Sequence, residues 1–305
     1  MNVSAAYIAV VLIWSTTPLG IVWSSESVHP TLAVLLRMMI ALIIGLVLLK
    51  AYNIKLPWHR NALKLYTFSA VGIFGGMLFS YYAAQYISSG LISLIFGLAP
   101  ILSGAIAQKM INEPKFSLTK KVALVIALIG LSIVCLDNFL LDENGYIGII
   151  LVLFAVSFFS VSSVLVKSVQ ISIHPLSTTI GALLLCTPLF FIVWLVFDGS
   201  WNYQQWQLRS ILSIIYLGVF GSLIGFIAYF YVLQKLTAST VALITMITPV
   251  LALSLGALLN NEHISINLMV GAIFVVAGLT CFQWSTKLSA TVNKRLRRSS
   301  NSAHL

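Results

Sequence analysis

The 305-residue chain is 60% hydrophobic and only 8% charged, and its mean hydropathy is +1.03. These values lie far outside the range of water-soluble globular domains. The composition therefore excludes a soluble protein and predicts an integral membrane protein, in which a net charge of +10 serves first to fix orientation.

Apolar runs of about 17 to 25 residues, long enough to cross the roughly 30 Å hydrocarbon layer as helices, recur ten times along the chain. We expect spans at 3–23, 32–49, 66–87, 90–109, 118–136, 146–167, 176–197, 211–233, 239–260 and 266–284. The first span has neither the cationic start nor the cleavage site of a signal peptide, so we expect a retained helix. The predicted fold is all-α and transmembrane.

Positive charges predict the orientation of the spans. Apart from Arg37 and Arg209, all Lys and Arg residues, 15 of 17, fall on one side if the N-terminus is cytoplasmic. Six of the seven acids fall on the other side. By the positive-inside rule both termini are expected inside the cell, in a multi-pass protein of the inner (plasma) membrane. Residues 287–305 form a basic tail that we interpret as disordered and cytoplasmic, an orientation signal rather than a nucleic-acid site.

Residues for metal binding or catalysis are scattered. Three cysteines, in or at the end of apolar spans, and five histidines show no paired spacing, so we expect no metal site and no cofactor. The spans hold no acid pair and no nucleophile with a partnering base, which predicts that the chain is not an enzyme.

An internal repeat relates the two halves of the chain. A shift of 149 residues aligns 72–113 with 221–262 without a gap, and 10 of the 42 positions are identical. The unusual residues agree: Gly72 with Gly221, Gly76 with Gly225, Tyr82 with Tyr231, Gln85 with Gln234, Pro100 with Pro249, and Asn112-Glu113 with Asn261-Glu262. Ten spans then divide into residues 1–137 and 138–286. Because each unit has five helices, the two copies are expected to enter the membrane from opposite sides.

The repeated glycines and prolines suggest different roles. Gly-x-x-x-Gly pairs allow helix backbones to approach closely, so a packing role is sufficient for them. Pro100 and Pro249 each remove a backbone donor within a span, which predicts helix breaks beside protein or a water-filled cavity, although a kink in plain packing gives the same pattern.

This pattern resembles the EamA branch of the drug/metabolite transporter superfamily. The resemblance covers nearly the whole chain and rests on the ten spans, on "LRMMIAL" at 36–42, on the two hairpins ending at Glu113 and Glu262, and on "ALIGLSIV" and "VVAGLTCF". It implies two inverted five-helix bundles around a central cavity and export or exchange of small metabolites, often amino acids. Trp14-Ser15 stands where the family shows tryptophan and glycine, and the lysine that ends the family's first helix is absent.

Arg37 is the single ionisable residue well inside a span. A charge at the bilayer centre costs at least about 2.5 kcal/mol, so such a residue is a functional candidate. Two interpretations remain open from the sequence. Arg37 snorkels to the headgroups or pairs with a carbonyl, or it binds a carboxylate or phosphate of the solute.

Mid-span aromatic and hydroxyl residues are the other candidates for the wall of the cavity. With Arg37, the predicted substrate-binding residues are Trp14, Thr17, Phe79, Tyr82, Ser93, Phe96, Phe159, Ser162, Tyr229, Tyr231 and Thr245. Aromatic walls with hydroxyls suit a neutral or zwitterionic solute by stacking and hydrogen bonding.

The sequence therefore predicts an alternating-access transporter, monomeric or homodimeric, of amino acids or related compounds. The spans contain no acid in their interior, which favours an exporter, facilitator or exchanger without ion coupling. The alternatives are a phospholipid or headgroup flippase on the same fold and a carrier of sugar phosphates or nucleotide derivatives. Membrane lipid and a small-molecule substrate are the expected partners.

Overall fold

The computed structural model describes residues 2–141, 144–169, 171, 173–236, 241, 244–282 and 284. The described part of the chain is helical, with no strands. In chain order the long elements are α1 (Val3–Ser24), α2 (Pro30–Ala51), α3 (Arg60–Ala83), α4 (Ser89–Phe96), α5 (Ala99–Met110), α6 (Leu118–Leu141), α7 (Gly145–Ser168), α8 (Pro175–Phe197), α9 (Leu208–Tyr216), η2 (Leu217–Ile224), α10 (Gly225–Lys235), α12 (Ile244–Asn260) and a last helix Ile266–Phe282. A short turn, η1 (Tyr203–Gln205), lies between α8 and α9.

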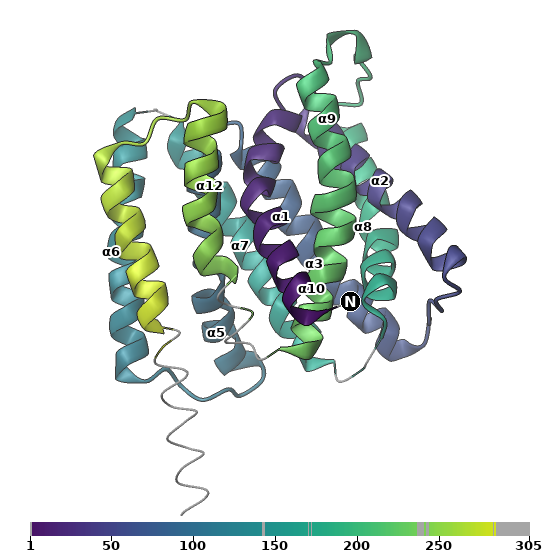
Figure 1. The fold of residues 1–305 in the computed structure, drawn as a ribbon, viewed down its shortest axis with the longest axis horizontal. Helices are drawn as coiled ribbons and strands as arrows, with labels where there is room; N and C mark the ends of the chain where they lie inside the picture. The colour runs from purple at the N-terminus through teal and green to yellow at the C-terminus, as the bar shows by residue number, and fades with distance from the viewer. Residues whose placement is uncertain are drawn as a thin grey trace, which may run out of the picture.

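The helices stand side by side in one bundle (Figure 1). We call the end where α1 begins the lower end and the end where α1 finishes the upper end. At the centre, α1 packs against α12, α10, α9 and α4, while α3 packs against α7 and α8. Helices from the first part of the chain, α1 to α6, therefore contact helices from the second part, α7 onward, throughout the core.

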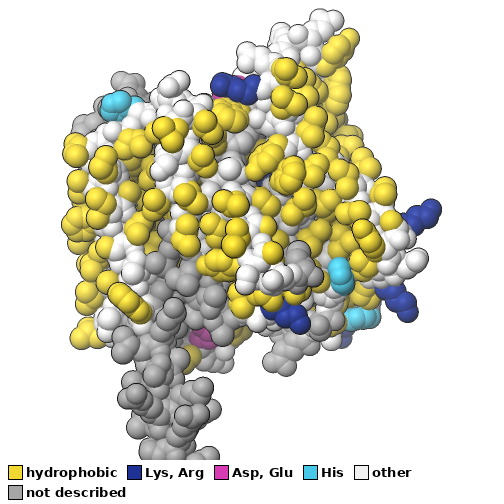
Figure 2. Space-filling view, in the orientation of Figure 1, with side chains coloured by type: hydrophobic (Ala, Val, Ile, Leu, Met, Phe, Trp, Pro, Cys, Tyr) yellow, Lys and Arg dark blue, Asp and Glu magenta, His cyan; other side chains and the backbone are white. Residues whose placement is uncertain are grey.

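The outer surface is apolar over the height of the bundle. Figure 2 shows hydrophobic side chains across the flank, with Lys, Arg and His at its ends and edge. Ile43 and Val47 on α2 are 58% and 61% exposed, a state that lipid tails satisfy and water does not. Eight helical segments are long and apolar enough to span a membrane, and α12 and the last helix are two shorter apolar ones. The chain is thus a multi-pass membrane protein.

The predicted span edges hold for most helices and fail at α3. The sequence predicts a span at 66–87, but the helix begins at Arg60, after the His59 ring accepts the amide hydrogen of Ala62. It ends at Ala83, and Ser88 then starts α4 by accepting the amide hydrogen of Leu91. Polar capping residues thus mark the start of α3 and the start of α4, whereas hydropathy alone followed the apolar run.

The two repeated prolines behave differently in the structure. The predicted span 90–109 consists of α4 and α5, separated at Gly97 and Leu98, and Pro100 occupies the first turn of α5. The break expected at Pro100 is therefore present. At Pro249 the expectation is wrong, because α12 runs through this proline without interruption.

A π-helix interrupts the predicted span 211–233. Between α9 and α10, the eight residues of η2 adopt the wider π-helical geometry. Gly218 and Gly221 face α2 there, and a methyl group added at Gly218 would lie 2.8 Å from Cβ of Ile40. Small residues at this position let α2 approach the π-helix closely.

Several predicted features fall at or beyond the limits of the described residues. Most of the first residues of the expected span 239–260 and the whole of the basic tail 287–305 lie outside them. The described part of that span begins with Ile244, apart from the single residue 241.

Candidate functional site

A central cavity of about 80 Å³ lies where helices from both parts of the chain meet. The side chains that line it are mostly apolar and aromatic, with several hydroxyl groups and one cation. They are Trp14, Thr17, Pro18, Ile21, Arg37, Met77, Ser80, Ile92, Ser93, Phe96, Ala99, Phe159, Gly221, Phe226, Thr245 and Thr248. None of these described lining residues is Asp, Glu or Lys. The volume holds several water molecules, so a metabolite requires the walls to move apart.

Trp14, Phe96 and Phe159 line one side of the cavity, and the ring of Tyr229 packs against Trp14 and Phe159. Phe159 of α7 lies at their centre, with its ring centroid 5.8 Å from Trp14, 5.9 Å from Tyr229 and 6.2 Å from Phe96. Trp14 and Tyr229 are also 4.9 Å apart. Edge-to-face and tilted pairs at these distances are favourable and form a continuous apolar wall.

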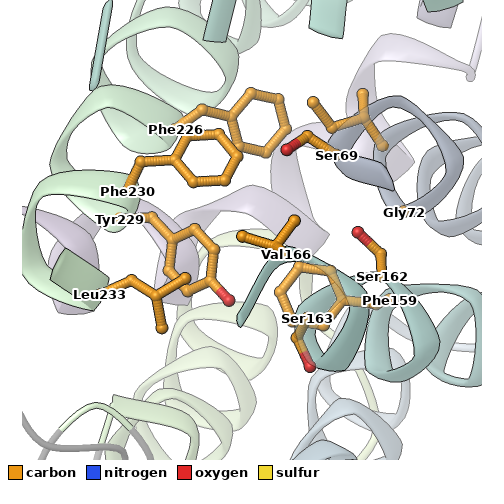
Figure 3. A pocket seen from close by; sticks show the side chains of 11 residues that line it. Ser69, Gly72, Phe159, Ser162, Ser163, Val166, Phe226, Tyr229, Phe230 and Leu233 are labelled. Carbon is orange, nitrogen blue, oxygen red and sulfur yellow. The ribbon is translucent and has the colours of Figure 1, made fainter. Parts of the chain in front are cut away.

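A second, smaller cavity of about 20 Å³ lies on the lower side of this wall. It is bounded by α3, α7 and α10 and shares Phe159 and Phe226 with the central cavity. Figure 3 shows the rings of Tyr229 and Phe159 near each other on its border. The hydroxyl of Ser162 donates to the carbonyl of Phe68 at 2.7 Å and so joins α7 to α3. Aromatic side chains thus separate two cavities that follow one another through the bundle.

Arg37 reaches the central cavity from α2. It lies seven residues after Pro30, about 10 Å along the helix, and its side chain is fully buried. Its Nε donates to Oγ of Ser222 in η2 at 2.7 Å, and its Cζ lies 6.0 Å from the Tyr81 ring centroid. Its Nη1 has no hydrogen-bond partner. Because the side chain is enclosed by protein, Arg37 does not snorkel to the headgroups.

Hydrogen bonds join α1, α4 and the end of α12 above the central cavity. The carboxylate of Glu262 accepts the amide hydrogens of Ser89 and Gly90, at 3.1 and 3.2 Å, and so caps the start of α4. Its neighbour Asn260 accepts a hydrogen bond from Nε1 of Trp23 in α1 at 2.8 Å. A negative charge at a helix N-terminus is favourable, so this corner is held by charge as well as by packing.

The structure places the predicted binding residues in three groups. Trp14, Thr17, Arg37, Ser93, Phe96, Phe159 and Thr245 line the central cavity. Ser162 and Tyr229 line the lower cavity, together with Phe159. Phe79, Tyr82 and Tyr231 line neither cavity. Phe79 stacks on Phe158 and contacts Phe154, and Tyr82 contacts Phe197.

Sequence reasoning missed several lining residues, including Pro18, Met77, Ser80, Phe226 and Thr248. Pro18 carried a usable signal. It lies within α1 four residues after Trp14, so it provides no amide hydrogen for the Trp14 carbonyl. Met77 and Phe226 carried none, because apolar residues occur at every turn of these helices.

The chain forms a bundle of apolar helices long enough to span a membrane, with an amphipathic cavity at its centre, an arrangement that suits a membrane carrier. The model of the EamA-like transporter family matches residues 3–136 and again 146–283. The chain belongs to this family and is a membrane transporter.

The chain is similar to several curated proteins over nearly its whole length, and a solved structure shares its fold. The uncharacterized transporter YoaV of Bacillus subtilis is 26% identical over 281 residues, which cover 92% of this chain and 96% of YoaV. Protein PagO of Salmonella typhimurium is 27% identical over 290 residues, 92% of each chain. A crystal structure with 18% sequence identity superposes with a TM-score of 0.64 over 92% of this chain and 96% of its own, which shows the shared fold.

Proposed function

We propose that this transporter carries amino acids and related neutral or zwitterionic compounds by alternating access, as an exporter, facilitator or exchanger. The observation that carries the proposal is the central cavity, whose aromatic rings and hydroxyl groups come from both parts of the chain. Rings stack on the apolar part of a small solute, and hydroxyl groups bind its polar end.

Repeated local structure supports the proposal of two inverted five-helix units, residues 1–137 and 138–286. His29-Pro30 begins α2 and His174-Pro175 begins α8, each with proline in the first turn. Gln85 donates to Ser25 in the loop after α1, and its repeat partner Gln234 donates to Ile173 in the loop after α7. Asn112 and Asn261, also partners, both have a left-handed backbone, with φ of 54° and 50°.

Contacts at the centre are reciprocal as well. A methyl group added at Gly76 would lie 3.9 Å from Cβ of Phe159, and one added at Gly225 would lie 3.7 Å from Nε1 of Trp14. Gly76 and Gly225 are repeat partners, and Trp14 and Phe159 take corresponding places in α1 and α7. Such reciprocity is expected when two copies of a unit pack about a two-fold axis, and a unit of five helices inverts its second copy.

The proposed cycle exchanges the shapes of the two units around a fixed solute. In this cycle the contacts of Glu262 with Ser89 and Gly90 act as the upper barrier, and Phe159, which lines both the central and the lower cavity, belongs to the lower barrier. Opening either barrier alone exposes the solute to one side of the membrane.

Counterflow in proteoliposomes tests the function. Vesicles preloaded with unlabelled amino acids are expected to accumulate labelled amino acids only when they contain the protein. Because the described residues lining the cavity include no carboxylate, we expect the same initial rate with and without a pH gradient. Translocation of a fluorescent phospholipid without any amino-acid counterflow would instead establish a flippase, and flux that follows the proton gradient would disprove uncoupled transport.

We also propose a location in the cell inner (plasma) membrane with the lower end facing the cytoplasm. The predicted spans put 15 of the 17 Lys and Arg residues, all except Arg37 and Arg209, on the cytoplasmic side. Alkaline phosphatase fused to the C-terminus is expected to be inactive in cells, because it is active only outside the cytoplasm. An active fusion contradicts this orientation.

A further inference from the structure

Arg37 is a buried cation whose charge no described residue balances. The described part of the chain has ion pairs only between His29 and Asp198 and between Arg209 and Glu26. A guanidinium group stays protonated in proteins, so Arg37 cannot relieve its burial by losing a proton. The positive charge therefore persists at the cavity wall, next to aromatic and aliphatic side chains.

The hydrogen-bond donors of Arg37 are also incompletely used. Its Nε is satisfied by Ser222, but its Nη1 has no partner, although the whole side chain is buried. Buried donors are nearly always paired in folded proteins, and an orphan next to a cavity indicates a missing acceptor. The acceptor must also be negatively charged to neutralise the group.

The structure holds the guanidinium in place. Ser222 belongs to the π-helix η2, and a methyl group added at the adjacent Gly221 would lie 3.1 Å from Nη2 of Arg37. Any larger residue at position 221 would require the guanidinium to shift. Short π-helical segments are frequent at functional sites, and this one fixes one edge of Arg37 while the Nη1 edge stays unpaired.

We infer that Arg37 binds the carboxylate of the transported solute and that this carboxylate, rather than the ammonium group of an amino acid, is the group recognised. The inference rests on the proposed function and narrows its substrate class. One carboxylate balances one guanidinium and matches its planar donors. A phosphate dianion would leave a charge unbalanced, and an ammonium group meets no carboxylate among the described lining residues.

Matched ligands test the inference on the unmodified protein. Purified protein is heated at pH 7.5 with L-phenylalanine, 3-phenylpropanoate, L-phenylalaninamide or 2-phenylethylamine, and with the corresponding four compounds derived from leucine. In the phenylalanine series, the leucine series or both, the two compounds with a carboxylate, the amino acid and its analogue without the ammonium group, are expected to raise the melting temperature to a similar extent. The amide and the amine of that series are expected to leave it unchanged. If no acid stabilises the protein, or if an amide or amine stabilises it equally, the inference is wrong.

Variants locate the carboxylate at Arg37. Arg37→Gln is expected to weaken binding of the stabilising acid about tenfold or more, and Arg37→Lys, which keeps the charge without the fork, is expected to weaken it less. Arg209→Gln, a control for an exposed arginine at the upper end, is expected to bind the acid like the unmodified protein. Equal affinity in Arg37→Gln disproves the assignment. Should Arg37→Gln not fold, Arg37→Lys and the ligand comparison still decide.

The same compounds separate this inference from the proposed function. Counterflow of amides or amines that is unaffected by Arg37→Gln leaves a transporter but removes the carboxylate requirement. Binding of acids without counterflow of any compound removes the transport proposal while leaving a carboxylate site.

Discussion

Phe159 is the residue on which both cavities depend. Its ring contacts Trp14, Phe96 and Tyr229, and it lines the central and the lower cavity at once. A rigid ring in this position limits the length of the solute that fits above it and blocks the route to the lower cavity. Solute size and separation of the two cavities are thus expected to be controlled by the same side chain.

Truncating this ring is expected to merge the cavities. In Phe159→Ala, counterflow of a large amino acid such as tryptophan should rise several-fold relative to alanine, because the lower cavity becomes part of the binding space. Stability should fall by less than the about 3–5 kcal/mol lost on truncating a fully buried phenylalanine, because Phe159 is only partly buried. Phe154→Ala is the control, since Phe154 lies on the same helix but is 52% exposed. An unchanged size preference in Phe159→Ala would refute the role of the ring.

The sequence located about half of the central wall, and helix geometry explains the remainder. Met77 and Ser80 line the cavity from one face of α3. Phe79 is two residues from Met77, about 200° around the helix, and so points away. A soluble helix reveals its buried face by a polar stripe on the other side. Because α3 is apolar on both faces, nothing in its sequence distinguished Met77 from Phe79.

Among the helices, the close packing of α6 against the last helix depends on a few glycines. A methyl group added at Gly130 of α6 would lie 2.6 Å from the carbonyl oxygen of Gly271 in the last helix, and one added at Gly278 would lie 2.7 Å from the backbone nitrogen of Ala127. These contacts involve backbone atoms, which cannot turn aside as a side chain can. Small residues on both helices thus allow α6 and the last helix to pack closely.

Alanine substitutions distinguish close packing from ordinary contact. Gly130→Ala must push two backbones apart, so we expect a loss of about 1–3 kcal/mol and a melting temperature lower by several degrees. Gly76→Ala adds a methyl group 3.7 Å from the Ala155 carbonyl oxygen, an ordinary distance, and alanine favours a helix. We therefore expect Gly76→Ala to be neutral or stabilising. Equal losses in both variants, measured by thermal unfolding in detergent, would contradict this account.

The sequence predicted where helices occur, but it predicted only some of the places where the helices are interrupted. The ten apolar runs follow from the length needed to cross lipid, and described helical structure lies within each of them. The break near Pro100 followed from a missing donor, yet the same argument failed at Pro249, where α12 tolerates the proline. The π-helix η2 contains no proline. It packs closely against α2, and such a tertiary contact cannot be read from the local sequence.

At the scale of the whole molecule, closure of the upper end depends on Glu262. Its carboxylate joins α12 to α4, and Asn260 beside it joins α12 to α1. The repeat partner Glu113 follows the same turn, since the amide of Glu113 donates to Ala107 and that of Glu262 to Gly256. Opening toward the upper side has to break the Glu262 contacts.

Neutralising Glu262 is expected to favour opening at the upper end. Glu262→Gln loses about 1–2 kcal/mol of charge-assisted hydrogen bonding, which increases the upward-open population about five- to thirtyfold. With Cys135, Cys186 and Cys281 replaced by serine and Ser93→Cys as a reporter in the cavity, a membrane-impermeant maleimide applied to intact cells measures this opening. Glu113→Gln is the matched control. Equally slow labelling of the reporter protein and of its Glu262→Gln and Glu113→Gln variants would show that Glu262 does not hold the upper end closed.

Arg37 breaks the likeness between the two halves. By the alignment of the His-Pro starts of α2 and α8, the place that corresponds to Arg37 is Ala182, which carries no charge. A solute held by Arg37 therefore meets different surroundings when the protein faces up and when it faces down. We expect the half-saturation concentrations measured from the two faces of the membrane to differ, whereas the ratio of maximal rate to half-saturation stays equal in both directions, as it must for a carrier that consumes no external energy.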